Sequence, residues 1–281
     1  MTTIQVHDGT FHCDELAAIV IYSIFNNIDL NDINIIRSRK IYDADVVMDV
    51  GGVYDPANMK FDHHQETFNL KRSNGIKFAS AGLVLRWVIM STKDNAVWKA
   101  LDKELIQQID ALDNGITICE PTIEKVFPVD LSKIINDFNA TWDDETDRFD
   151  EALRFMEMII KNKIKRIKAK IAAKDEYLTW ESFENILVLP RFSPWQAVVV
   201  NNPRFRTVKF VIYPSTDKTG FKVQGAPVRS GDFACRAYLR PEWRGKESVE
   251  EIKTFKFCHM TGFIGEASTI EDAILMAKLS M

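Results

Sequence analysis

Four short stretches of the chain carry histidines or acids of the kind that bind metal. Residues 7–15, HDGTFHCDE, hold two histidines, three acids and a cysteine. Residues 61–65, FDHHQ, follow the run VVMDVGG at 46–52, in which an acid stands just before two glycines. A further acid precedes a glycine in ALDNG at 111–115. Carboxylates and imidazoles suit a hard divalent pair such as Mn²⁺, with one carboxylate bridging ions about 3.5–4 Å apart.

Six residues are candidate metal ligands. Each one also has an ordinary interpretation: a strand-end or loop histidine, a helix cap or first-turn acid at position 14, and turn acids at 49 and 113. All six stand at expected ends of strands or helices, and this joint placement favours a metal site over the separate alternatives. The six are His7, His12, Asp14, Asp49, His63 and Asp113. We interpret the neighbouring Cys13 as a small helix residue rather than a soft ligand.

The first half of the chain alternates short β-branched runs with helical patterns, which predicts a parallel sheet flanked by helices. Acids at the carboxyl ends of such strands point into the crevice where open α/β sheets bind ligands. Strands are expected at 4–7, 33–36 and 45–49, and helices at 14–25, 81–90 and 96–112.

A long helical pattern over 151–177 connects to a second part rich in strands and turns. The basic run 161–174 on this helix is either a phosphate-attracting ridge or, as we favour, a solvated face opposite inward isoleucines. We expect strands at 185–189, 198–200, 207–213 and 221–224, with a hairpin turn at 217–220. A capping box over Ser268–Glu271 should begin a helix at about 270–278. The predicted domains are 1–178 and 179–281.

Composition narrows the class of protein. The 281 residues include 46% hydrophobic residues and carry a formal net charge of −4, which argues against disorder and against a uniformly cationic DNA-binding surface. No apolar run is long enough to cross a bilayer, and the four scattered cysteines suggest reduced thiols. We expect a soluble cytoplasmic protein, with nuclear or mitochondrial location also open and the oligomeric state undetermined.

The DHH triplet at 62–64, with the strand-end acid and the N-terminal cluster, resembles the DHH phosphoesterase superfamily. The chain is more closely similar to the Myg (melanocyte-proliferating-gene) exonuclease family. Its resembling motifs run from residue 7 to 267: HDGTFHCDE, DVGGVYDP, FDHHQ, SAGLV, ALDNG, EWRG and HMTGFIGEA. The resemblance implies an α/β fold, with a Rossmann-like parallel-sheet DHH domain and a smaller C-terminal α/β domain.

The resemblance also implies roles for single residues. His7, His12 and Asp49 would surround one metal, and Asp14, Asp49, His63 and Asp113 the other, with Asp49 as the bridge. The superfamily usually has an aspartate where His12 stands, and a third imidazole moves metal preference toward Zn²⁺ or other later metals. We expect two Mn²⁺ ions, with Zn²⁺ or Mg²⁺ as alternatives. Asp62 would hold an imidazole in its tautomer, and His64 would face the substrate phosphate. The expected catalytic residues are therefore Asp49, Asp62, His63 and His64.

Substrate contacts are expected from both domains. Ser80, at a helix start, would donate to a phosphate or serve as an ordinary N-cap. Arg236, Arg240 and Arg244 are phosphate contacts or surface salt-bridge partners. HMTGFIGEA resembles a glycine-rich substrate loop, with His259, Gly262 and Gly265 expected at the ligand and Glu266 departing from the family pattern.

Together these features predict a two-metal phosphodiesterase that removes nucleotides from RNA or short oligonucleotides with 3′-to-5′ polarity. RNA preference and polarity follow from the resemblance alone. A small-molecule phosphoesterase acting on dinucleotides, nucleoside bisphosphates or pyrophosphate is an alternative, distinguished by the lack of a basic, partly aromatic track such as 161–174 with Trp243. The other alternative is a non-catalytic protein that binds nucleic acid or a partner.

Overall fold

The computed structural model describes residues 1–124 and 126–281, and the side chains of 174 and 175 lie outside the described residues. Lys174, the last residue of the basic run 161–174, is one of these two. The chain divides into two compact units, Met1–Lys168 and Ala169–Met281. The division falls within helix α6 (Phe149–Glu176), whereas the sequence placed the boundary just beyond this helix.

The first unit is built on a five-stranded sheet in the order β2-β1-β3-β5-β4. β4 is antiparallel to β5, and the other neighbours are parallel, so the predicted α/β class with a parallel N-terminal sheet is confirmed. The sequence missed β4 and β5 because two residues are too few to show alternation. The strands are β1 (Thr2–Val6), β2 (Ile33–Arg37), β3 (Val46–Met48), β4 (Tyr54–Asp55) and β5 (Lys60–Phe61).

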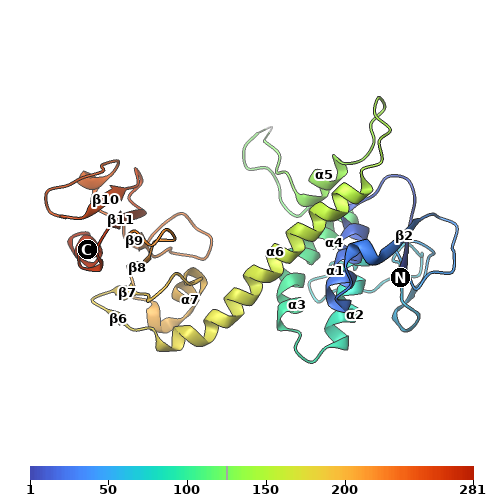
Figure 1. Cartoon of the computed structure of the whole chain (residues 1–281), viewed down its shortest axis with the longest axis horizontal. Helices are drawn as coiled ribbons and strands as arrows, with labels where there is room; N and C mark the ends of the chain where they lie inside the picture. Colours follow the sequence, from blue (N-terminus) through green and yellow to red (C-terminus); the bar gives the residue numbers. More distant parts are fainter. Residues whose placement is uncertain (125) are drawn as a thin grey trace. The chain divides into compact units, whose positions relative to one another are not determined.

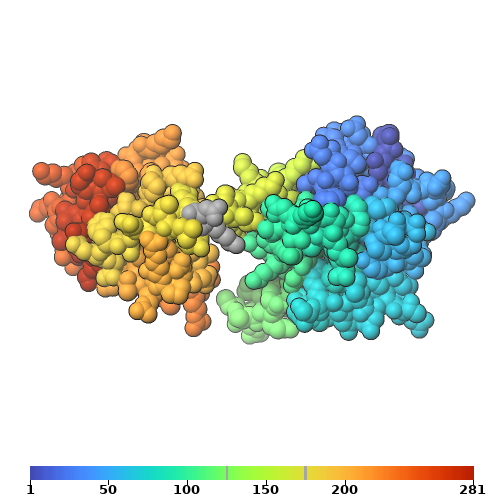
Figure 2. All heavy atoms as spheres, turned by 90° about the horizontal axis from the view of Figure 1, so that it is seen from below, coloured from blue at the N-terminus to red at the C-terminus, as the bar shows by residue number. Residues whose placement is uncertain are grey.

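Helices pack on this sheet and on one another (Figure 1). In the space-filling view of Figure 2, successive segments of the first unit, coloured blue, cyan and green along the sequence, pack against one another. The middle of the first helix, residues 16–21, is apolar on every side because it lies between the sheet and a second helix, and its Leu16, Ile19 and Ile21 are fully buried. The helices are α1 (Cys13–Asn26), α2 (Ser80–Ser91), α3 (Ala96–Leu101), α4 (Gln107–Asp113), α5 (Leu131–Asn136) and α6.

The predicted helix at 96–112 is present, but it contains a π-helical turn. α3 and α4 are joined by the π-helical residues Asp102–Ile106. Such insertions are frequent near functional sites, because they rotate the helix that follows. The turn therefore helps to set the direction in which the end of α4, with Asp113, is presented.

The basic stretch of α6 has the character of an amphipathic helix. Ile160, Ile164 and Ile167 are buried. Lys161 Nζ lies 2.7 Å from Glu157 Oε1, and Lys163 Nζ lies 3.0 Å from Glu104 Oε2. These contacts agree with the solvated-face interpretation. No helix among the described residues is long and apolar enough to span a membrane.

The second unit has a six-stranded mixed sheet in the order β10-β11-β9-β8-β7-β6. Alternate residues of β8 enter two cores, Phe210 and Ile212 on the α8 side and Val211 and Tyr213 on the α7 side. The strands are β6 (Ser182–Phe183), β7 (Ile186–Val188), β8 (Phe210–Pro214), β9 (Phe221–Gly225), β10 (Phe255–Cys258) and β11 (Ile264–Ala267). The helices are α7 (Gln196–Asn201) and α8 (Ile270–Leu279).

Two predicted details of the second unit were wrong. The strand expected at 198–200 is part of helix α7, because a short β-branched run does not by itself distinguish a strand from a buried helix segment. The N-cap of α8 is Thr269, not Ser268, and Thr269 Oγ1 accepts a hydrogen bond from the N–H of Asp272. The helix begins at Ile270, as expected.

A buried ion pair in the first unit makes one glycine necessary. Arg72 pairs with Asp110 and with Asp102, and a Cβ added at Gly82 would lie 1.9 Å from Asp110 Oδ2 and 2.8 Å from Arg72 Nη2. We expect Gly82→Ala to lower the free energy of unfolding by roughly 2–4 kcal/mol, because overpacking disturbs a buried charge pair. Denaturant titration measures this change. Met90→Ala, at an exposed position of the same helix, should stay within about 0.5 kcal/mol, and equal effects of the two substitutions would contradict the explanation.

Candidate metal centre

The carboxyl ends of β1 and β3 lie at a cavity of about 910 Å³, which is lined by the candidate ligands of the first unit. Asp49 follows β3 directly and adopts a left-handed backbone with φ of 57°, an uncommon conformation that aspartate tolerates better than most residues. His7 follows β1, and His63 and His64 follow β5. The six candidate ligands all line this one cavity.

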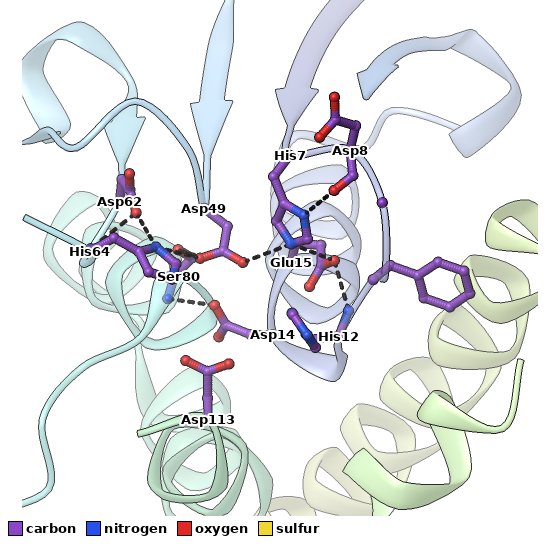
Figure 3. Close-up of polar contacts among 12 residues, drawn as sticks. His7, Asp8, His12, Asp14, Glu15, Asp49, Asp62, His64, Ser80 and Asp113 are labelled. Atoms are coloured by element: carbon purple, nitrogen blue, oxygen red, sulfur yellow. Dashed lines mark hydrogen bonds and ion pairs between the residues drawn. The ribbon is translucent and has the colours of Figure 1, made fainter. Parts of the chain in front are cut away.

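Asp49 is at the centre of the arrangement (Figure 3). Its Oδ2 lies 3.5 Å from His7 Nε2, while its Oδ1 lies 3.3 Å from His63 Nε2 and 3.5 Å from His64 Nδ1. The Ser80 hydroxyl also donates to Oδ1, at 3.1 Å. The two oxygens of one carboxylate therefore face two different sets of imidazoles, which is the arrangement that a bridging carboxylate requires.

Among the residues that the structure describes, three groups of side chains have ligand atoms within 4.8 Å of one another and could each hold a metal ion. Asp49 belongs to two of them and His63 to two, so the groups are contiguous. They are His7, His12, Glu15 and Asp49; Asp49, His63 and His64; and Asp14, His63 and Asp113.

Glu15 is the site residue that the sequence prediction missed. Its Oε1 accepts a hydrogen bond from the His12 N–H at 2.7 Å and lies 3.2 Å from His7 Nε2. His12 is the N-cap of α1, so Glu15 occupies the third helical position of a capping box. Glu15 stands three residues after His12, which is the spacing of a capping box. The sequence did not reveal the contact because the cap residue is a histidine rather than the usual serine or threonine.

Asp14 and Ser80 hold the start of α2 against the cavity. Asp14 is fully buried, and its carboxylate accepts the backbone N–H groups of Ser80 at 2.7 Å and Ala81 at 2.8 Å. The N–H of Gly82 donates to Asp110. These donors are directed at protein carboxylates, Ser80 is fully buried, and Ala79 rather than Ser80 is the N-cap. Ser80 thus positions Asp49 and Asp14.

Asp62 organises the turn that carries both histidines. Its Oδ1 lies 2.8 Å from His64 Nδ1 and accepts the backbone N–H of His63 at 2.7 Å, while its Oδ2 accepts the N–H of Gly52. Burial raises the pKa of Asp62, but these hydrogen bonds outweigh it and the net pKa is below the usual value. The same contact raises the pKa of His64, whose side chain is 61% exposed.

The cavity holds more negative charge than its protein neighbours neutralise. Burial, followed by the charges of Asp113 and Asp49, raises the pKa of Asp14 well above its usual value. Burial and Asp49 likewise raise the pKa of Asp113. The hydrogen bond that the His7 imidazole donates to the Glu15 carboxylate raises the pKa of His7 to about 9 despite burial. Protonated His7 cannot be a ligand, so metal affinity should increase as the pH rises toward this value.

Two buried atoms support the fit of metal ions to this donor set. Glu15 Oε2 is buried without a hydrogen-bond partner, which is costly unless another group satisfies it. His63 Nε2 is also buried, and it lies 3.3 Å from Asp49 Oδ1 and 3.2 Å from Asp113 Oδ2 without the geometry of a hydrogen bond to either. Both belong to the groups described above. The mixture of imidazole and carboxylate is suited to Mn²⁺, Zn²⁺ or related divalent ions. The residues present therefore fit bound divalent metal.

The three arginines predicted to bind phosphate make contacts within the second unit. Arg236 donates to the carbonyl oxygens of Phe205, Val208 and Val199. Arg240 Nε donates to Leu279 O at 2.7 Å. Arg244 Nη2 donates weakly to Leu239 O, and its buried Nε has no hydrogen-bond partner. The Arg236 guanidinium thus holds the end of α7 and the residues that follow it, through their backbone carbonyl oxygens.

The stretch HMTGFIGEA forms a β-hairpin between β10 and β11. Gly262, with φ of 74°, lies in the turn beside exposed His259, whereas Gly265 is inside β11, where a Cβ would meet Leu239 and Met276. Packing against Leu239 and Met276 therefore explains why a glycine stands at position 265, without the close approach of a ligand that the sequence suggested. Glu266 is paired with Lys256 Nζ at 2.9 Å. Trp243 is 1% exposed and is not available to stack on a base.

Comparison with known proteins matches nearly the whole chain to one family. The family model MYG1_exonuc, described as "Uncharacterised protein family (UPF0160)", matches residues 3–281. A MYG1 protein of Saccharomyces cerevisiae is 30% identical over 329 residues, covering 99% of this chain and 95% of its own length. A MYG1 protein of Dictyostelium discoideum is 29% identical, with 98% and 95% covered. The MYG1 exonuclease of Homo sapiens is 28% identical, with 99% and 85% covered.

Among solved structures, a pGpG-specific phosphodiesterase from Vibrio cholerae aligns over 99% of this chain and 97% of its own. The sequence identity is 13% and the TM-score is 0.34.

The geometry of the cavity predicts stabilisation by divalent metal. Saturating Mn²⁺ or Zn²⁺ should raise the melting temperature of the first unit by about 5–10 °C, because an ion present at about 100 times its Kd adds ~2.7 kcal/mol to folded-state stability. Asp49→Asn and His63→Ala should lose most of this increase in a thermal melt with and without chelator. Asp94→Asn, which changes an exposed acid outside the cavity, should retain it. A wild-type protein whose melting temperature no divalent ion changes would contradict the metal centre.

Proposed function

The chain belongs to the MYG1 exonuclease family, and from that premise we propose that it is a metal-dependent phosphodiesterase that removes nucleotides from the 3′ end of RNA. The observation that carries the proposal is the position of Asp49, whose two oxygens face separate imidazole groups in one cavity. Relatives that carry the name MYG1 exonuclease support the nuclease activity. RNA preference and polarity are proposed from the family resemblance.

Two divalent ions fit this proposal, one among His7, His12, Glu15 and Asp49 and the other among Asp14, Asp49, His63 and Asp113. When bound, such ions supply Lewis-acid activation of water and neutralise charge on the phosphate oxygens. We propose two Mn²⁺ ions first, with Zn²⁺ or Mg²⁺ as alternatives. The cleavage assay described below compares the three metals.

The protein's own residues prepare the cavity for a phosphodiester. His64, held by Asp62, presents a partly exposed imidazole whose raised pKa favours the cation that binds a phosphate oxygen. Arg39 and Lys77 line the same cavity and add positive charge. Ser80 holds Asp49 by its hydroxyl, and Asp14 holds the start of α2, so these residues keep the carboxylates in place while substrate binds. No covalent intermediate on the protein is needed.

The direct test uses single-stranded RNA labelled at its 5′ end and incubated with purified protein and Mn²⁺, Mg²⁺ or Zn²⁺. We expect a ladder that shortens stepwise from the 3′ end, that chelator abolishes, and that Asp49→Asn and His63→Ala reduce by at least about 100-fold. RNA blocked by a 3′-terminal modification should resist, whereas RNA modified at the 5′ end should not.

Other outcomes of this test select the alternatives. Intact RNA with hydrolysis of a dinucleotide or nucleoside bisphosphate would replace the exonuclease by a small-molecule phosphoesterase, for which the size of the cavity is suitable. No turnover of any phosphodiester, with metal nonetheless bound, would support a non-catalytic binding protein.

The Asp62–His64 contact predicts a shift in pH dependence. Because Asp62 raises the pKa of His64, the His64 cation persists to higher pH than a free imidazole and is lost as the pH rises through that raised pKa. Asp62→Asn removes this effect, so the alkaline limb of the pH–kcat/KM profile should move to lower pH. Asp55→Asn, which changes a half-buried acid of β4 outside the cavity, is the matched control and should leave the limb unchanged. An unchanged limb in Asp62→Asn would exclude this role of His64.

A further inference from the structure

The loop between β1 and α1 carries a candidate ligand at each end. His7 precedes the loop and His12 follows it, and both belong to the group with Glu15 and Asp49. The loop turns at Gly9, whose φ is 81°. Its residues 8–10 are largely exposed, so burial within the loop does little to fix the two histidines relative to each other.

Asn139, distant in sequence, holds this loop by two hydrogen bonds to one residue. Its Nδ2 donates to Phe11 O at 2.8 Å, and its Oδ1 accepts from the Phe11 N–H at 2.9 Å. Phe11 is the residue directly before His12. A primary amide offers a donor and an acceptor side by side, so asparagine can satisfy both backbone groups of one residue at once.

A second group of contacts secures the same loop from the other side. Arg37, at the end of β2, donates to Gly9 O and pairs with Asp147 Oδ2 at 2.9 Å. Its guanidinium lies 4.6 Å from the ring centroid of Phe149 and 5.5 Å from that of Phe11. The Phe11 and Phe149 rings are buried and meet edge to face at 5.4 Å. These contacts anchor the Phe11 side chain, which leaves its backbone orientation to the Asn139 amide.

Asn139 also belongs to the segment that forms one wall of the cavity. Its N–H donates to Asn136 O at 3.0 Å, at the end of α5. Asn136 and Ser132 of α5 line the cavity together with His12 and Cys13. The amide therefore joins the α5 wall to the histidine loop, and a displacement of either one changes the distance between His12 and Asp49.

We propose that Asn139 is a positioning residue that fixes the His7–His12 loop and thereby sets the affinity of the metal position formed by His7, His12, Glu15 and Asp49. This inference rests on the proposed function, because it assumes that the cavity binds two ions. Asn139 is not one of the candidate ligands and acts through the backbone of Phe11. In the position formed by Asp14, His63 and Asp113, His63 follows β5 and Asp113 ends α4. Asp14 lies in α1, but the backbone N–H groups of Ser80 and Ala81 hold its carboxylate, so this position should not depend on the Asn139 contact.

The test counts metal ions rather than turnover. Metal-free protein is titrated with Mn²⁺ by calorimetry, and bound metal is measured after gel filtration, for wild type, Asn139→Ala and Asn139→Asp. Wild type should bind two ions. Both variants should bind one ion with wild-type affinity and the second about 10–100-fold more weakly, as loss of a group that orients a ligand typically causes. Asn139→Asp is nearly isosteric but cannot donate to Phe11 O.

A second measurement, on metal-free protein, separates positioning from general destabilisation. Amide hydrogen exchange in a peptide covering residues 8–13 should become faster in Asn139→Ala, while exchange in β8 stays at the wild-type rate. Asn201→Ala is the matched control, because it removes an amide that donates to Ala197 O in the second unit. It should bind two ions with unchanged affinity. If Asn139→Ala melts below the assay temperature, Asn139→Asp provides the same measurements.

The outcomes distinguish the inference from its premise. A wild-type protein that binds no Mn²⁺, Zn²⁺ or Mg²⁺ contradicts the proposed function and this inference with it. Two ions in wild type and two ions of unchanged affinity in both Asn139 variants contradict the inference alone. Equal weakening of both ions, with unchanged exchange over residues 8–13, also overturns it, because Asn139 would then act only through overall stability.

Discussion

Four carboxyl groups clustered at one partly buried cavity are the constraint on which the rest of the first unit depends. Asp14, Asp49 and Asp113 line the cavity, and Glu15 lies beside its His7. Burial and mutual repulsion raise the pKa of Asp14 and Asp113. The histidines on either side of Asp49 relieve only part of this repulsion. A site of this kind is costly to fold unless cations are bound, and that cost is the physical reason for assigning it to divalent metal.

The start of α2 is the structural means by which the chain tolerates these charges. Backbone N–H groups of its first turn point at Asp14 and Asp110, at the end of the helix that favours negative charge. Arg72 then pairs with Asp110 on the side away from the cavity. Burial raises the pKa of Asp110 to about 7 although Arg72 opposes it. The helix start thus serves two carboxylates at once, and Gly82 is needed because any side chain would enter the ion pair.

The sequence predicted the parts of the fold and site that local pattern determines. Strand-end acids and clustered histidines led to six candidate ligands, and the structure places all six around one cavity. Parallel strands bring their carboxyl ends together, which explains the meeting of the strand-end residues His7 and Asp49. Glu15 was missed because its contact with His7 depends on a helix cap made by a histidine. The contact between Phe11 and Asn139 joins residues 128 positions apart, and no local pattern records it. The valine run at 198–200 was wrongly predicted to be a strand, because a buried helix segment and a strand can share that composition.

The measurement that tests the central claim most directly is the anomalous scattering of crystals of this protein grown or soaked with Mn²⁺. Two peaks about 3.5–4 Å apart, one beside His7 and one beside His63 with Asp49 between them, are the result that the account predicts. A single peak elsewhere, or Mn²⁺ bound only at the protein surface with Asp49 in contact with its histidines alone, would contradict the assignment of this cavity as a two-metal centre.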